Sequence, residues 1–310
     1  MTITSCYKKG VTEATARPNL MAVLWLFNIL FASILYFIFF GAFETAVGPS
    51  LALKDLLKTG DMNIILETLT KPANPFASAF RAAPIVILLY FLANVFLQGG
   101  ILSILIAPRG RQKFAACFFG GGGQFYGRFL RLLIYSAVVW VPVGVLFVAV
   151  NAVLRVLGDP SRERQMVLFV IIRFALGLFL LHLVKMVLDY ARIMIATRDS
   201  RTVFRALKDA VRFVVRRFRG TLGLYYLLGL TGLAISLAYL GVKSIIGATT
   251  AAGILAVFLI TQVYIAGRGW LRAAYQAGQL EMFISESPPQ ETNQETNKGE
   301  AGAKEETAAL

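Results

Sequence analysis

The sequence has few residues of the kinds that build metal centres and many catalytic sites. It contains one histidine, His182, and two cysteines, Cys6 and Cys117, among 310 residues. A histidine-based metal site, a histidine proton relay and a disulfide framework are therefore not expected. The sequence also lacks the HExxH, GxSxG and phosphate-loop motifs. We accordingly predict no metal, no other cofactor and no catalytic residue.

Charged residues are also scarce. Asp, Glu, Lys and Arg make up 15% of the chain, hydrophobic residues 57%, and the mean hydropathy is +0.67. A soluble domain has about 25% charged residues, so the deficit points to lipid as the solvent. The net charge of +14 could suggest nucleic acid. The cations lie at the ends of apolar runs, however, where the positive-inside rule places them, so we predict no nucleic-acid partner.

Six segments satisfy the requirement of a membrane-spanning helix for about 20 mostly apolar residues. They cover residues 18–43, 82–108, 132–154, 165–188, 220–242 and 244–267. We therefore predict an all-α membrane protein with a transmembrane domain over residues 18–284. A cytoplasmic segment, residues 1–17, precedes it, and an acidic, disordered cytoplasmic tail, residues 285–310, follows it. Between the first two spans, residues 51–58 and 61–70 fit short amphipathic helices.

The loops between the spans differ in charge. Most lysines and arginines fall in the loops on the side that holds both termini. The positive-inside rule places these loops in the cytoplasm. We expect a multi-pass protein of the bacterial inner (plasma) membrane, with its N-terminus and C-terminus in the cytoplasm.

The connection at residues 201–219 has the pattern of a basic amphipathic helix. Its cations share an arc of about 80°, and its apolar residues, Val203, Phe204, Leu207, Val211, Val214, Val215 and Phe218, fall on the other side. Asp199 and Ser200 fit an N-cap, and Gly220 fits a stop. Such a helix lies in the membrane interface with its cations towards phosphates, or it only anchors the chain. The candidate lipid-phosphate contacts here and before the third span are Arg128, Arg131, Arg201, Arg205, Lys208, Arg212, Arg216 and Arg219.

A short repeat suggests how the spans are grouped. Residues 125–131 and 213–219 share the pattern F-x-x-R-x-x-R, and each leads into an apolar helix. The simplest layout is three helical hairpins, spans one–two, three–four and five–six, joined by basic amphipathic elbow helices on the cytoplasmic side. The four consecutive glycines at residues 120–123 are predicted to form a flexible joint between the second span and the elbow that follows it.

Polar residues recur along the second, fourth and sixth spans near their cytoplasmic ends. Ionisable groups at such depth are costly and need an explanation. We hypothesise that they line a shared recess suited to an anionic group such as a lipid phosphate. The alternative is that they pair with one another and hold the helices together. The candidate recess residues are Asn94, Gln98, His182, Lys185, Asp189, Arg192, Tyr264 and Arg268.

The sequence resembles a group of uncharacterised bacterial multi-pass inner-membrane proteins. The resemblance is carried by FLQGG in the second span, QFYGRFLRL before the third, and LDYARIMIATRD followed by AVRFVVRRFRGTLGLYYLL. The layout is similar to the membrane domain of some glycerophosphoryl diester phosphodiesterases. No phosphodiesterase barrel is present, so hydrolysis is not implied, and the resemblance assigns no functional residue.

Three classes of function remain open from the sequence. We predict a non-enzymatic membrane protein that interacts with anionic lipid headgroups, or with a membrane-protein partner or a second copy of itself, through the basic elbows. A transporter of a small anionic or amphiphilic solute is the alternative, and it would need helices broken near the midplane of the membrane. An intramembrane enzyme is the third, and only Asp189 is well placed to serve it.

Overall fold

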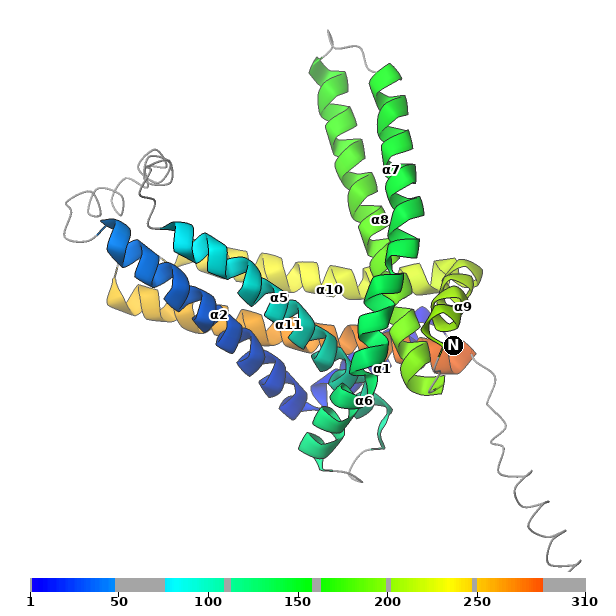
Figure 1. Cartoon of the computed structure of the whole chain (residues 1–310), viewed down its shortest axis with the longest axis horizontal. Coiled ribbons are helices and arrows are strands. Elements are labelled where there is room, and N and C mark those ends of the chain that lie inside the picture. The colour runs from blue at the N-terminus through cyan, green and yellow to red at the C-terminus, as the bar shows by residue number, and fades with distance from the viewer. Residues whose placement is uncertain are drawn as a thin grey trace, which may run out of the picture.

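The structure is a computed structural model that describes residues 2–47, 76–108, 113–157, 163–198, 202–246 and 250–286. Within these ranges the chain is helical and contains no strand. The helices predicted at residues 51–58 and 61–70, and nearly all of the predicted tail, lie outside the described residues. The described helices are α1 (Ile3–Thr15), α2 (Pro18–Val47), α5 (Phe76–Ile106), α6 (Phe114–Tyr135), α7 (Ala137–Leu157), α8 (Glu163–Arg198), α9 (Val203–Arg216), α10 (Phe218–Ile245) and α11 (Ala251–Glu286) (Figure 1).

Six segments of the described chain are long and apolar enough to cross a membrane. They lie in α2, in α5, in α6 with α7, in α8, in α10 and in α11. The predicted all-α fold with six transmembrane helices is therefore confirmed. Large apolar side chains are exposed along these segments, for example Phe37 (70%), Phe174 (69%) and Val263 (73%). Surface of this kind is ordinary in contact with lipid and unfavourable in water, so the chain is a multi-pass membrane protein.

Several helix bounds differ from the predicted ones. α7 begins at Ala137, after a break at Ser136, so residues 132–135 of the predicted third span belong to α6. α8 continues to Arg198 and α11 to Glu286, beyond the predicted ends of their spans. The prediction that Gly220 ends the basic helix is wrong, because α9 ends at Arg216 and Gly220 lies inside α10. A helix backbone in or near lipid has few other hydrogen-bond partners, so one glycine does not end it.

The four glycines at residues 120–123 lie inside α6, so the prediction of a flexible joint is wrong. Gly121 and Gly122 are buried against α5. A Cβ added at Gly99 of α5 would lie 3.1 Å from the Gly121 carbonyl oxygen. The two backbones are thus almost in contact, and the glycines serve close packing.

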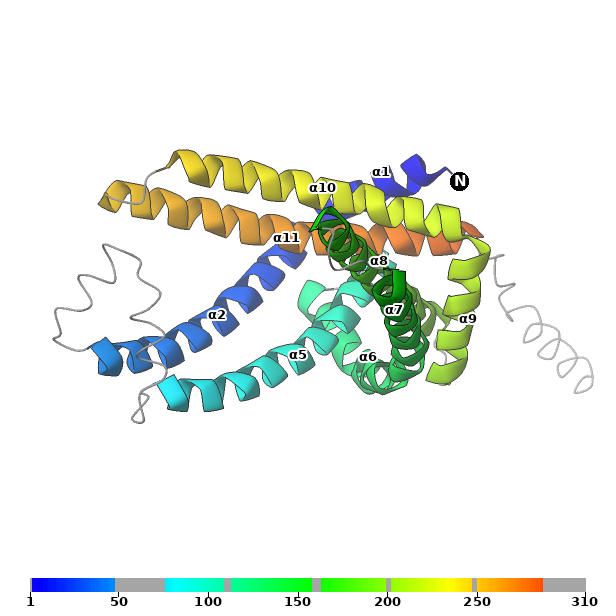
Figure 2. The ribbon, with the colours of Figure 1, turned by 90° about the horizontal axis from the view of Figure 1, so that it is seen from above.

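The long helices are arranged in three pairs that extend from a common base. α2 packs on α5, α7 packs on α8, and α10 packs on α11. The α7–α8 pair leaves the base in a different direction from the other two (Figures 1 and 2). We call each of these pairs an arm.

The other three helices, α1, α6 and α9, connect the arms in a ring. α6 packs on α5, α9 packs on α8, and α1 packs on α11. Each of them therefore contacts the second helix of an arm other than the one it leads into, and α1 on α11 joins the beginning of the chain to its end. That α6 and α9, which contain the predicted elbows, lie on the surface of the membrane stays a prediction.

Most of the buried side chains lie where these contacts meet. Two clusters of buried apolar residues, which include Tyr190, Leu132, Leu24 and Leu228, form the core of this region. The outer parts of the arms, by contrast, expose most of their large apolar side chains. We call the buried region the hub, and it consists of α1, α6, α9 and residues 18–24, 94–106, 184–198, 218–228 and 269–286.

Candidate functional site

Polar residues of α5, α8 and α11 meet where the arms join the hub. The Arg272 guanidinium on α11 donates through Nη1 to Asn94 Oδ1 on α5 at 2.7 Å, and its Nη2 lies 3.5 Å from the Asn94 carbonyl oxygen. On α8, Arg192 Nη1 donates to Asp189 Oδ1 at 2.7 Å. Asp189 is also within electrostatic range of Lys185 and Arg272. The structure therefore brings the polar stripes of three different arms to one place.

This cluster lies about one hydrocarbon thickness from the outer ends of the arms. At 1.5 Å per residue, Asn94 is about 27 Å along α5 from Phe76, and Arg272 is about 32 Å along α11 from Ala251. The hydrocarbon core of a bilayer is about 30 Å thick. A membrane that covered the arms would therefore place the cluster at its boundary with the headgroups.

Aromatic side chains surround the cluster on the side of α10. The Tyr275 hydroxyl donates to the Tyr225 carbonyl oxygen at 3.0 Å, and the two rings lie 5.1 Å apart. The His182 ring lies edge-on to Tyr225 at 5.6 Å and beside Tyr226 at 6.1 Å. His182 thus belongs to an aromatic wall formed by α8 and α10.

The remaining recess candidates lie in different surroundings. Tyr264 contacts Ser236 at 3.2 Å and stacks on Tyr239 at 4.3 Å, so it belongs to the α10–α11 arm. Lys185 and Arg268 are exposed. Gln98 lies one turn beyond Asn94 on α5, and its Oε1 is buried without a hydrogen-bond partner among the described residues.

The sequence places Arg268 and Arg272 on the same polar face of the sixth span, and the predicted recess residues included only Arg268 of the two. In the structure Arg272 makes the contact with α5, whereas Arg268 is exposed one turn away. The spacing of four residues places both on one face of α11 and could have suggested either of them. Which of the two points inwards is decided by the packing of α11 on its neighbours.

The second candidate surface is α9, and most of its residues belong to one of three groups that differ in exposure and polarity. The side chains that face the hub are Val203, Ala206, Leu207, Ala210 and Val214. Phe204 (53%), Val211 (37%) and Val215 (68%) are apolar and exposed. Arg205, Lys208, Arg212 and Arg216 are exposed as well. At 100° per residue, the exposed apolar group lies between the buried group and the basic group.

This arrangement corrects the predicted single apolar face of the basic helix. The apolar residues that the sequence placed together are divided between the hub and the surface, because α9 must also pack on α8. The exposed group continues towards the α7–α8 arm, since the Phe204 ring lies 6.0 Å from the Tyr135 ring at the end of α6. Ile134 (69%) and Val138 (54%) are exposed beside that tyrosine in the sequence.

The other predicted phosphate contacts lie on neighbouring helices. Arg131 on α6 and Arg219 on α10 are exposed. Arg128 is half-buried, and its guanidinium lies 5.9 Å from the centre of the Phe125 ring. Arg201 lies outside the described residues, as do the predicted N-cap residues Asp199 and Ser200.

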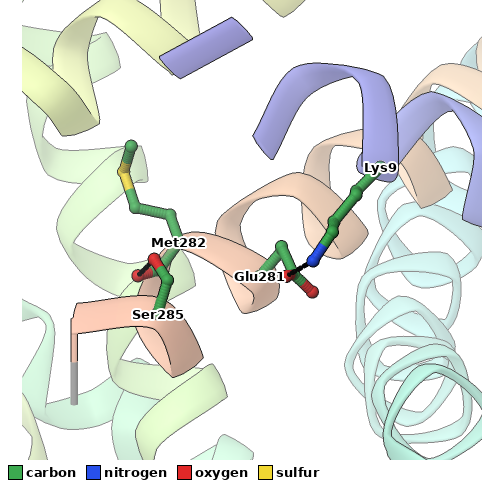
Figure 3. Close-up of polar contacts among 4 residues, drawn as sticks. All are labelled: Lys9, Glu281, Met282 and Ser285. Carbon is green, nitrogen blue, oxygen red and sulfur yellow. Dashed lines mark hydrogen bonds and ion pairs between the residues drawn. The ribbon is translucent and has the colours of Figure 1, made fainter. Parts of the chain in front are cut away.

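Two pockets, of about 340 and 410 Å³, open beside the end of α5. The first lies between α5 and α6, and the second between α1, α5 and α11. Glu281 lines the second pocket and forms an ion pair with Lys9 of α1 (Figure 3). This hydrogen bond raises the pKa of the Lys9 ammonium above its ordinary value. Neither pocket is lined by a residue of the predicted recess.

No cluster of three or more His, Cys, Asp or Glu side chains that could hold a metal ion occurs within the described ranges. Comparison of the chain with protein-family models, curated proteins and solved structures gives no match. The resemblance to bacterial inner-membrane proteins and to phosphodiesterase membrane domains therefore stays a prediction.

Proposed function

We propose that this protein is a non-enzymatic, multi-pass protein of the bacterial plasma membrane that binds the anionic headgroups of the cytoplasmic leaflet through α9. With α9 on the cytoplasmic leaflet, the hub and both termini face the cytoplasm, and the arms cross the bilayer. The positive-inside rule supports the orientation, because α9 and its flanks carry the densest group of cations in the sequence.

The observation that carries the proposal is the pairing of exposed apolar and basic side chains on α9. Phe204, Val211 and Val215 are exposed in the described part of the chain, and four exposed cations lie beside them. An amphipathic helix in the membrane interface buries its apolar side chains among the acyl chains and directs its cations to phosphates. Each cation near an anionic leaflet contributes about 1 kcal/mol at low salt.

The position of α9 agrees with an interfacial helix. α9 lies across the beginning of α10 and packs on α8 (Figure 2). A helix that lies in the interface must run across the spans that it joins. The contact between Phe204 and Tyr135 also makes the exposed apolar group continuous with the arm that enters the bilayer.

The transport alternative calls for spans that are broken near the midplane. Among the described residues, α5 runs as one helix from Phe76 to Ile106 in spite of Pro84, and α8, α10 and α11 are also unbroken within their bounds. The continuous arms favour the lipid-associated function.

Two matched double variants test the proposal. K208Q with R212Q removes two cations of α9, and R81Q with K243Q removes two cations from the opposite ends of the arms. Each protein is purified in mild detergent, and the binding of phosphatidylglycerol and of phosphatidylcholine is compared by native mass spectrometry. We expect the α9 variant to lose about 2 kcal/mol, or roughly 30-fold, in affinity for phosphatidylglycerol at low salt.

The control variant should bind phosphatidylglycerol as the wild type does, and no variant should change the binding of phosphatidylcholine. Equal losses in the two double variants would show that net charge, and not α9, attracts the lipid. A wild-type protein that does not distinguish the two lipids would refute the proposed function.

A further inference from the structure

The cluster at the junction of α5, α8 and α11 has more cations than carboxylates. Asp189 forms an ion pair with Arg192, and both side chains are mostly buried, with exposures of 13% and 19%. Arg272 has Asn94, a neutral residue, as its partner. Among the described residues no carboxylate lies within ion-pair distance of Arg272. One carboxylate therefore faces two guanidinium groups and the nearby Lys185 ammonium.

A partly buried guanidinium without a counter-anion is costly, because the apolar side chains around it do not compensate its charge. Arg192 adds to the cost for Arg272, since the two cations are within electrostatic range of each other. Asp189 is already bonded to Arg192, so it cannot neutralise both. The positive charge of the cluster is therefore balanced only when a further anion is present.

We propose that Arg272, together with Lys185, binds the phosphate group of an anionic ligand at this junction. Asn94 is the positioning residue. Its Oδ1 holds Nη1 of the guanidinium at 2.7 Å, and its own Nδ2 donates to the Tyr90 carbonyl oxygen at 2.9 Å. The guanidinium has five N–H donors, of which the two contacts to Asn94 engage two, so donors remain for a ligand.

The chemistry of the donors selects a phosphate. A guanidinium presents paired N–H groups that match two phosphate oxygens, and an ammonium adds a point charge. Two glutamines lie one turn further along the same helix faces, Gln98 after Asn94 and Gln276 after Arg272. Each has a buried Oε1 without a hydrogen-bond partner among the described residues. Rotation of either carboxamide exchanges that oxygen for an NH₂ donor.

The depth of the cluster admits two sources of phosphate, a lipid headgroup that enters between the arms and a free anion that enters from the aqueous side. The cluster lies about 30 Å from the outer ends of α5 and α11, at the level of the headgroups. The site does not depend on α9, because none of its residues belongs to that helix. Binding here and binding on α9 can therefore fail separately.

The test uses the full-length protein, freed of bound lipid in detergent, and two variants of neighbouring arginines on α11. Arg272→Gln removes the proposed ligand, and Arg268→Gln removes an exposed cation one turn away. Phosphatidylglycerol is titrated by native mass spectrometry and inorganic phosphate by thermal shift. We expect Arg272→Gln to bind at least about tenfold more weakly and Arg268→Gln to bind within about twofold of the wild type.

The two probes distinguish the sources. Binding of phosphatidylglycerol without a response to inorganic phosphate assigns a lipid headgroup, and saturable stabilisation by inorganic phosphate assigns a free anion. If the wild type binds neither probe saturably, or if folded Arg272→Gln binds as the wild type does, the site does not exist.

A third variant keeps the test decisive if Arg272→Gln does not fold. Lys185 is exposed, so Lys185→Gln should fold normally. A severalfold weaker affinity in this variant supports the site, and an unchanged affinity refutes it. Arg272→Gln should weaken binding by the same factor when it is added to the double variant K208Q with R212Q, because the two sites share no residue, and this separates the inference from the proposed function of α9.

Discussion

Replacement of Gly10 by valine tests whether α1 closes the ring of helices by packing on α11. A Cβ at Gly10 would lie 2.8 Å from the Gly278 Cα and 2.9 Å from the Ala274 carbonyl oxygen. Both are backbone atoms, which cannot move aside as a side chain can. Carbon atoms in contact are about 3.5–4.0 Å apart, so α1 must move away by about 1 Å. Overpacking of this kind costs about 2 kcal/mol.

The thiol of Cys6 on α1 reports this change. Cys6 is 1% exposed, and burial raises the pKa of its thiol above its ordinary value, so the wild type should react slowly with a maleimide. If labelling requires α1 to open locally, a loss of about 2 kcal/mol speeds it by about 30-fold. The assay uses protein in which Cys117 is replaced by serine, so that Cys6 alone is labelled.

Gly123→Val is the matched control, because Gly123 lies in α6 and a Cβ there would have no neighbour within 4 Å. Its labelling rate should equal that of the wild type. Equal rates for Gly10→Val and the wild type would refute the close packing of α1 on α11, and with it the ring.

Three further predictions follow from the hub and from α9. Asp189→Ala removes the carboxylate of a buried ion pair and should lower the free energy of unfolding by about 3–5 kcal/mol. The loss should appear as a smaller yield of folded protein on size-exclusion chromatography. Arg268→Gln, which removes an exposed cation, should leave that yield unchanged. A fluorophore at position 204 should be quenched by brominated lipid more strongly than one at position 212, because Phe204 belongs to the exposed apolar group and Arg212 to the basic group. Stronger quenching at position 212 would contradict the proposed placement of α9. The hydrogen bond from Lys9 to Glu281 raises the pKa of the Lys9 ammonium above its ordinary value. The contribution of this ion pair to stability should therefore be complete at neutral pH and be lost only as the pH rises through the raised pKa. Thermal melting of the wild type and of Lys9→Gln at several pH values measures it.

The membrane spans could be predicted from the sequence because lipid imposes one simple requirement. About 20 apolar residues without charge must form a helix in a bilayer, since the backbone has no other hydrogen-bond partners there. Composition alone therefore indicated the six spans. The ends of the helices were less predictable. A break falls at Ser136 within an apolar run, whereas Gly220 and the glycines at 120–123, a residue type that often ends helices, lie inside α10 and α6.

The candidate site was only partly predictable. Spacing placed Asn94, Asp189 and Arg192 on polar stripes, and the structure brings these residues together with Arg272. Spacing could not show that Tyr264 belongs to the α10–α11 arm or that Arg268 points away. Residues one turn apart share a helix face, and only the neighbouring helix decides which of them it covers.

Composition and local pattern were enough to predict six apolar helices, to place the cations at one end of them, and to make metal or histidine chemistry unexpected. These properties depend on composition and on periodicity along one segment at a time. Three features came only from the arrangement of the helices in space: α1 packs on α11, α9 divides its apolar residues between the hub and the surface, and Arg272 contacts Asn94 and not a carboxylate. Each of these is a contact between residues far apart in the chain, and such contacts depend on how whole helix surfaces fit together.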